Sequence, residues 1–111
     1  MFNKEINPFS VTDKVRFRNV DKTLTLTVRA DASALVVGLK KSNERLSAMT
    51  DEIPEAERLE SARFFAVTLF GNEQGNKLCE FYNNDPLSII TACGMYFQNR
   101  LAKKITKAQK K

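Results

Sequence analysis

Two short segments near the start of the chain alternate between apolar and polar residues, and this pattern constrains the fold more than any other feature. Residues 14–18 read KVRFR and residues 23–29 read TLTLTVR. A period of two that uses β-branched and aromatic residues predicts strands. The polar residues 19–22 (NVDK) between them predict a turn. We therefore predict a β-hairpin over residues 11–29.

One face of this predicted hairpin is apolar, whereas the other is basic and rich in threonine. The apolar face comprises Val15, Phe17, Leu24, Leu26 and Val28. The opposite face comprises Lys14, Arg16, Arg18, Arg29 and three threonines. Because an isolated two-stranded hairpin is only marginally stable in water, the apolar face must pack against the segments that follow.

The rest of the chain predicts helices. Apolar residues recur at helical spacing in residues 32–49, 54–70, 75–82 and 86–107, as expected for amphipathic helices with a buried face. The predicted fold class is α+β, with an N-terminal β-hairpin packed on a bundle of three to four α-helices. One domain is expected to cover residues 1–111.

Particular residues mark the ends of these predicted helices. Asp31 and Asp85 can cap the helices that follow them, with Pro86 at a first helical position. Gly71 is suited to end the helix before it, and Gly94 predicts the close approach of a neighbouring helix. The predicted buried stripe of the last helix comprises Leu87, Ile90, Gly94, Phe97, Leu101 and Ile105.

The composition argues against several kinds of chemistry. The chain contains no histidine, which removes the commonest general acid–base and the commonest metal ligand. Cys79 and Cys93 are too few and too far apart for a zinc or CxxC motif, so we expect both to be reduced and buried. We therefore expect no catalytic residue, no cofactor and no metal, and we expect that the protein is not an enzyme.

The hydropathy of the chain predicts a cytoplasmic protein without a membrane partner. No apolar run approaches the roughly 20 residues of a transmembrane helix. The first ten residues lack the apolar segment of a signal peptide.

The net charge of +5 has its excess at the C-terminal end. Residues 100–111 contain six basic residues and no acid, whereas residues 1–99 contain 12 basic and 13 acidic residues. On a helix, one basic stripe would comprise Arg100, Lys103, Lys104, Lys107 and Lys111. Such a stripe is compatible with a solvated helix end, an acidic protein partner or nucleic acid. Because the sequence contains no recognised nucleic-acid-binding motif, we expect any binding to nucleic acid to be weak and nonspecific.

The predicted helices carry more apolar residues than one face of each helix can bury. Phe64 lies off the main stripe of its helix, which predicts either a second packed neighbour, such as the hairpin, or an exposed patch for a partner. Leu101 and Ile105 extend the last stripe beyond what a domain of this size needs to cover, which predicts a homo-oligomer. The candidate partner-binding residues are Phe64, Phe97, Arg100, Leu101, Lys103, Lys104, Ile105 and Lys107.

The order of segments along the chain carries a family resemblance. After the hairpin and its helices, residues 64–71 read FFAVTLFG, residues 77–82 read KLCEFY, and Asp85-Pro86 opens a terminal helix that ends in KITKAQKK. This layout resembles the tail assembly chaperones of prophages and Gram-positive siphophages.

The resemblance implies a non-enzymatic protein that binds the tape measure protein during tail assembly. Such chaperones cover amphipathic helices with apolar grooves and often self-associate, and many are made in two lengths by a ribosomal frameshift. The expected function is thus a phage tail assembly chaperone or scaffolding protein in the host cytoplasm. The alternative is a small nucleic-acid-binding protein that uses the basic C-terminal helix.

Overall fold

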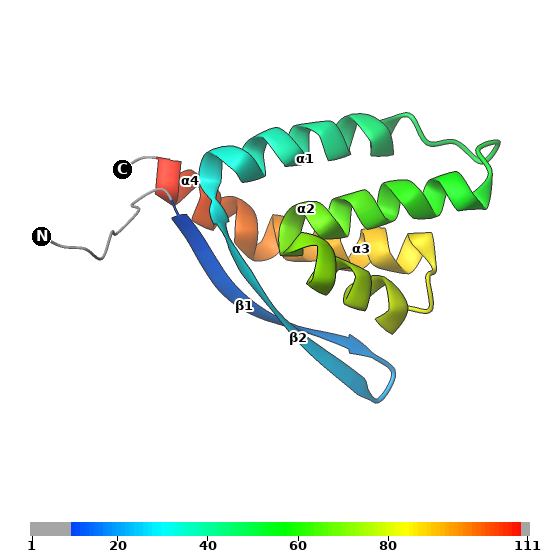
Figure 1. Cartoon of the computed structure of the whole chain (residues 1–111), viewed down its shortest axis with the longest axis horizontal. Coiled ribbons are helices and arrows are strands. Elements are labelled where there is room, and N and C mark those ends of the chain that lie inside the picture. Colours follow the sequence, from blue (N-terminus) through cyan, green and yellow to red (C-terminus); the bar gives the residue numbers. More distant parts are fainter. Residues whose placement is uncertain (1–9, 110–111) are drawn as a thin grey trace, which may run out of the picture.

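The predicted fold class is confirmed by a computed structural model, which describes residues 10–109 (Figure 1). Strands β1 (Ser10–Asn19) and β2 (Lys22–Asp31) form an antiparallel hairpin that lies against the helices. The helical elements are α1 (Ala32–Ser47), α2 (Glu55–Phe81), α3 (Pro86–Tyr96), the π-helical segment η1 (Phe97–Leu101) and α4 (Ala102–Gln109).

The hairpin has the predicted turn and the predicted apolar face. Val15 pairs with Leu26 and Phe17 pairs with Leu24 across the two strands. All four point to the same side, and three of them are buried while Leu24 is half-buried. The strands continue beyond residues 11–29, because the pairing runs on until Ser10 lies opposite Asp31.

Two predicted helix caps are present in the structure. The Asp31 carboxylate accepts a hydrogen bond from the backbone N–H of Ser33 at 3.0 Å. The Asp85 carboxylate accepts one from the backbone N–H of Ser88 at 3.1 Å, and Pro86 takes the first position of α3. Each cap satisfies a backbone donor that the helix itself leaves unpaired.

The predicted helices over 54–70 and 75–82 are both present within α2, as two helical segments that meet at Gly71, the residue predicted to end the first of them. Gly71 has φ 88° and ψ 170°, which turns the chain in a single residue, and the second segment begins directly after it, without the expected loop. Beyond the kink, Gly75 packs against the main chain of the preceding turns, since a Cβ added there would lie 2.8 Å from the Cα of Val67. Glycine at this position therefore permits the close approach.

The predicted buried stripe of the last helix is confirmed at Leu101 and Ile105 and is wrong at Leu87 and Gly94. Leu87 is 72% exposed and does not belong to the buried stripe. Gly94 has no neighbour within 4 Å of an added Cβ, so the predicted close approach at this glycine is wrong. The buried residues of this helix beyond Pro86 are Ile89, Cys93, Tyr96, Leu101, Ile105 and Ala108.

The π-helical segment η1 keeps this buried stripe continuous. Leu101 follows Tyr96 by five residues, and five residues of α-helix would turn it about 140° away from the buried face. Hydrogen bonds from i to i+5 widen the turn and return it to that face. The expectation that Leu101 and Ile105 extend beyond the domain is wrong, because both are buried in the chain's own core.

Three aromatic rings lie where the hairpin meets the helices. Phe70 of α2 stacks on Tyr96 of α3 with ring centroids 5.8 Å apart. Phe17 of β1 meets the two rings edge-on, at 5.7 Å from Phe70 and 6.3 Å from Tyr96. The trio belongs to a buried cluster that joins the hairpin to α1, α2 and the last helix, so the apolar face of the hairpin is covered.

Both cysteines are free and buried, as predicted. Burial raises the pKa of the Cys79 thiol and of the Cys93 thiol. They pack as small apolar side chains in the core.

Gly75 of α2 and Gly94 of α3 offer a matched test of the close packing that follows Gly71. Gly75→Ala is expected to lower the free energy of unfolding by about 1–3 kcal/mol, because its Cβ would overlap the Val67 main chain. Gly94→Ala is expected to raise it by up to about 1 kcal/mol, because alanine is the better helix former and the site is open. Denaturation followed by circular dichroism measures both, and a shift of the same sign in both variants would contradict this packing.

Candidate functional site

An apolar groove of about 400 Å³ lies between α1 and the last helix, and we call it the α1–α4 groove. Helix α1 supplies one wall, and η1 with α4 supplies the other. The apolar lining includes Leu39, Leu46, Phe65, Phe97, Ala102 and Ile105. The groove is therefore a concave apolar surface between two helices, a form that amphipathic helices bind.

Basic residues border this groove. Lys40 lines it from α1. Ala102 and Thr106 extend it into a shallow hollow on α4 that Lys103 and Lys107 also line. Within residues 10–109, neither the groove nor the hollow has an acidic residue in its lining. The surface favours a partner with acidic residues beside an apolar stripe.

A buried hydroxyl in the lining of the groove has no internal partner. Ser42 is 1% exposed, and its Oγ makes no hydrogen bond to any residue among 10–109. Serine within a helix commonly bonds back to the carbonyl of the preceding turn, and an unsatisfied buried hydroxyl costs about 1–3 kcal/mol.

The structure does not bring the predicted partner-binding residues together at one site. Phe97 and Ile105 line the α1–α4 groove, Lys103 and Lys107 line the adjoining hollow, and Leu101 is buried in the core.

Phe64 lies apart from the groove, and its second neighbour is α1. The guanidinium carbon of Arg45 lies 4.8 Å from the centroid of the Phe64 ring. The ring is partly covered by a cation–π contact of the ordinary kind. This contact agrees with the first of the two predicted alternatives, a second packed neighbour, which here is α1.

Arg100 and Lys104 are engaged by a buried carboxylate that the sequence interpretation missed. Asp13 lies on the inner face of β1 and is 8% exposed. The Tyr96 hydroxyl donates to its carboxylate at 2.8 Å, and an Arg100 guanidinium nitrogen donates at 2.7 Å. Lys104 Nζ lies 3.8 Å from the same carboxylate. The pKa of the Tyr96 hydroxyl is raised, mainly because the group is buried and to a smaller extent because it donates a hydrogen bond to Asp13.

The Asp13 cluster therefore divides the predicted basic stripe. Arg100 and Lys104 form ion pairs with Asp13 of the hairpin. Lys103 and Lys107 instead line the hollow on α4. A signal was present in the sequence, because Asp13 continues the period-two positions of Val11, Val15 and Phe17. An acid at such a position predicts a buried ion pair.

Comparison with protein-family profiles, curated proteins and solved structures finds no match to this chain. Within residues 10–109, no group of three or more metal-ligating side chains comes together. No helix in that range combines the length and apolarity needed to cross a membrane.

The Asp13 cluster yields a stability prediction. Asp13→Ala is expected to lower the free energy of unfolding by about 1–3 kcal/mol, because the Tyr96 hydroxyl loses its acceptor where water is scarce. Asp13→Asn keeps an acceptor and is expected to cost less. Glu73→Ala removes an exposed acid from α2 and should change stability by less than about 0.5 kcal/mol. Equal effects of Asp13→Ala and Glu73→Ala in urea denaturation would contradict the role of this cluster.

Proposed function

We propose that this chain is a non-enzymatic assembly chaperone or scaffolding protein of the phage tail type. In this proposal it binds an amphipathic helix of a partner protein in the α1–α4 groove. The observation that supports it is an open apolar groove between helices that is bordered by lysines and lined by no acid among residues 10–109.

The groove matches a helix with one apolar face and acidic flanks. A helix places residues i, i+3, i+4 and i+7 on one face, which would pack against Leu39, Phe97 and Ile105. Acidic residues on its flanks would then lie near Lys40 on one side and Lys103 on the other. Apolar contact would provide most of the affinity, and the lysines would select the partner by charge.

The resemblance in segment order extends this proposal to a partner and a compartment. In the resembled family the partner is the tape measure protein, a long and partly helical chain. The same resemblance implies that the protein acts in the cytoplasm of the host cell and that it self-associates.

The nucleic-acid alternative has less support from the charges on α4. Arg100 and Lys104 pair with Asp13, so within residues 10–109 the basic stripe retains Lys103 and Lys107 for phosphates. Because affinity for nucleic acid rises with the number of phosphates neutralised, we keep the expectation of weak, nonspecific binding. Lys111, the last member of the predicted stripe, lies outside the described residues.

Binding of a designed helix tests the proposed groove. The probe is a fluorescent synthetic helix with a leucine stripe and glutamates on both flanks, titrated against the full chain in an anisotropy assay. Thr106→Glu is expected to weaken binding about tenfold, because it brings a like charge and a polar group to the apolar surface. Lys40→Glu is expected to weaken it about fivefold through reversal of one exposed charge pair.

Two matched controls accompany this titration. Lys41→Glu makes the same charge change one residue outside the groove lining, and Thr91→Glu repeats the threonine substitution on an exposed part of α3. Both should leave the affinity unchanged. Equal losses in Lys40→Glu and Lys41→Glu, or no binding of the probe by the unaltered chain, would contradict the proposal.

Self-association has a different basis from the one that the sequence predicted. Leu101 and Ile105 are buried, but Val37 of α1 is 55% exposed and lies outside the groove lining. We expect light scattering over a concentration series to show dimers or larger species, which Val37→Lys should weaken. Val20→Lys, at the exposed hairpin turn, is the matched control. A monomer at all concentrations would contradict this part of the proposal.

A further inference from the structure

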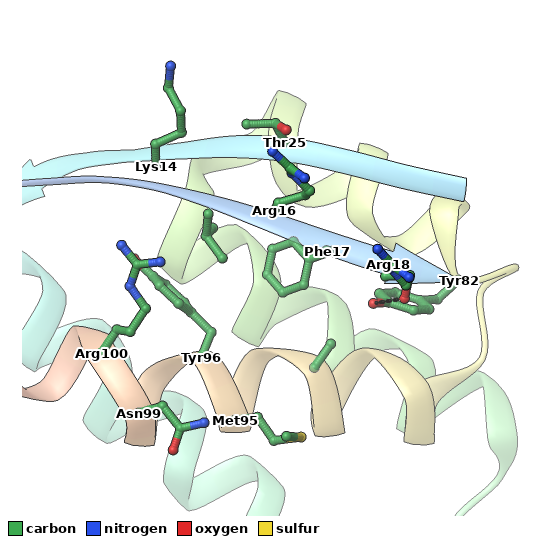
Figure 2. Close-up of a pocket in the computed structure, with 12 residues that line it drawn as sticks. Lys14, Arg16, Phe17, Arg18, Thr25, Tyr82, Met95, Tyr96, Asn99 and Arg100 are labelled. Carbon is green, nitrogen blue, oxygen red and sulfur yellow. Dashed lines mark hydrogen bonds between the residues drawn. The ribbon is translucent and has the colours of Figure 1, made fainter. Parts of the chain in front are cut away.

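A second groove, of about 870 Å³, runs between β1 and the last helix (Figure 2), and we call it the β1 groove. Apolar side chains from both elements line its inner part, among them Val15, Phe17 and Met95. Figure 2 shows Met95 and Arg100 on the helix below the strand, and Lys14 extending to the opposite side of the strand. The basic residues in its lining are Lys14, Arg16, Arg18 and Arg100.

The pairing register shows which backbone groups of β1 face this groove. Asn19 lies opposite Lys22 across the two-residue turn, and such a closing pair exchanges both of its hydrogen bonds. Hydrogen-bonded pairs then recur at every second residue, so the N–H and C=O groups of Lys14, Arg16 and Arg18 point away from β2.

Two side-chain contacts agree with this assignment. The Tyr82 hydroxyl donates to the carbonyl oxygen of Arg18 at 3.0 Å, on the outer edge of β1. On the outer edge of β2, the Gln74 side chain accepts from the N–H of Thr27 at 3.0 Å and donates to its carbonyl at 2.8 Å. Gln74 thus occupies the edge of β2 in the way that a neighbouring strand would.

The edge of β1 lacks such a cover next to Lys14 and Arg16. Among residues 10–109, no group outside the hairpin makes a hydrogen bond with the backbone of these two residues, whereas Tyr82 covers Arg18 and Gln74 covers β2. An uncovered strand edge is a template for another extended chain. Here the template lies beside a groove whose inner part is apolar and can receive side chains.

We propose that the β1 edge binds an extended segment of a partner protein, which adds to the sheet as a third strand and alternates acidic and apolar residues. Side chains on the outer face of that strand would lie beside Lys14 and Arg16, which favours glutamate or aspartate. Side chains on the inner face would lie beside Val15 and Phe17 and over Met95, which favours apolar residues.

Charge selects this occupant over a second copy of the chain. Two β1 strands paired edge to edge would bring Lys14, Arg16 and Arg18 of each copy together, and like charges directly opposite each other destabilise a strand pair. Basic residues on an edge strand prevent such self-pairing, but they attract an acidic strand. The groove proposed for a helix lies elsewhere and shares none of these residues.

Peptide binding tests this inference independently of the helix-binding groove. The probe is a fluorescent peptide of about nine alternating glutamate and valine residues, long enough to follow β1 from Lys14 to Arg18. Two further peptides carry backbone N-methyl groups, either on the glutamates or on the valines. Only one of these two sets faces β1 in an added strand, so one methylated peptide should lose binding by at least about tenfold while the other binds normally.

Variants of the chain locate the peptide. Arg16→Glu is expected to weaken binding by about tenfold or more, whereas Arg29→Glu makes the same charge change on β2, outside the groove lining, and should have little effect. Lys14→Pro removes an edge N–H that the hairpin does not use and should also abolish binding. Thr23→Pro does the same on the edge of β2 and is its control, and circular dichroism confirms that each variant folds.

Three outcomes would overturn the inference. The first is binding that survives both methylation patterns, which would show that backbone pairing is not used. The second is equal loss in Arg16→Glu and Arg29→Glu, which would indicate net charge alone. The third is a labelled oligonucleotide that competes with the peptide and binds more tightly, with the same dependence on Arg16, which would assign this surface to nucleic acid.

Discussion

Tyr96 makes the contact on which the rest of the structure depends. Its ring packs against Phe70 of α2 and Phe17 of β1, and its hydroxyl donates to Asp13. One side chain therefore joins the apolar core to a buried polar cluster and links three elements. A two-stranded hairpin has little stability of its own, so these contacts fix the position of β1. The position of β1 in turn determines where its open edge lies relative to the last helix.

The parts of the fold that depend on local chemistry could be predicted from the sequence. Alternation in 14–18 and 23–29 specified the hairpin and its buried face, and Asp31 and Asp85 specified two helix starts. These signals act within a few residues, through side-chain direction and backbone capping, so they do not require knowledge of the tertiary structure.

The parts that depend on distant neighbours could not be predicted in this way. Leu101 and Ile105 are buried members of the predicted stripe, but the π turn η1 that keeps Leu101 in line with Tyr96 was not predicted. In the first half of the last helix, Tyr96 is buried against the hairpin and Leu87 is exposed. The α1–α4 groove was predicted in part, through Phe97 and Ile105, but its other wall comes from α1, more than fifty residues earlier in the chain. The β1 groove required the strand register together with the position of α3.

The segment η1 borders both grooves, and its geometry favours two independent sites. Phe97 lines the α1–α4 groove, and Arg100 lines the β1 groove. For one partner to affect the other, this turn would need a second arrangement of similar energy. In α geometry Leu101 would lie about 140° around the helix from Tyr96, which would remove a fully buried leucine from the core at a cost of several kcal/mol. The core therefore holds η1 in one arrangement, so that each groove remains formed whether or not the other is occupied.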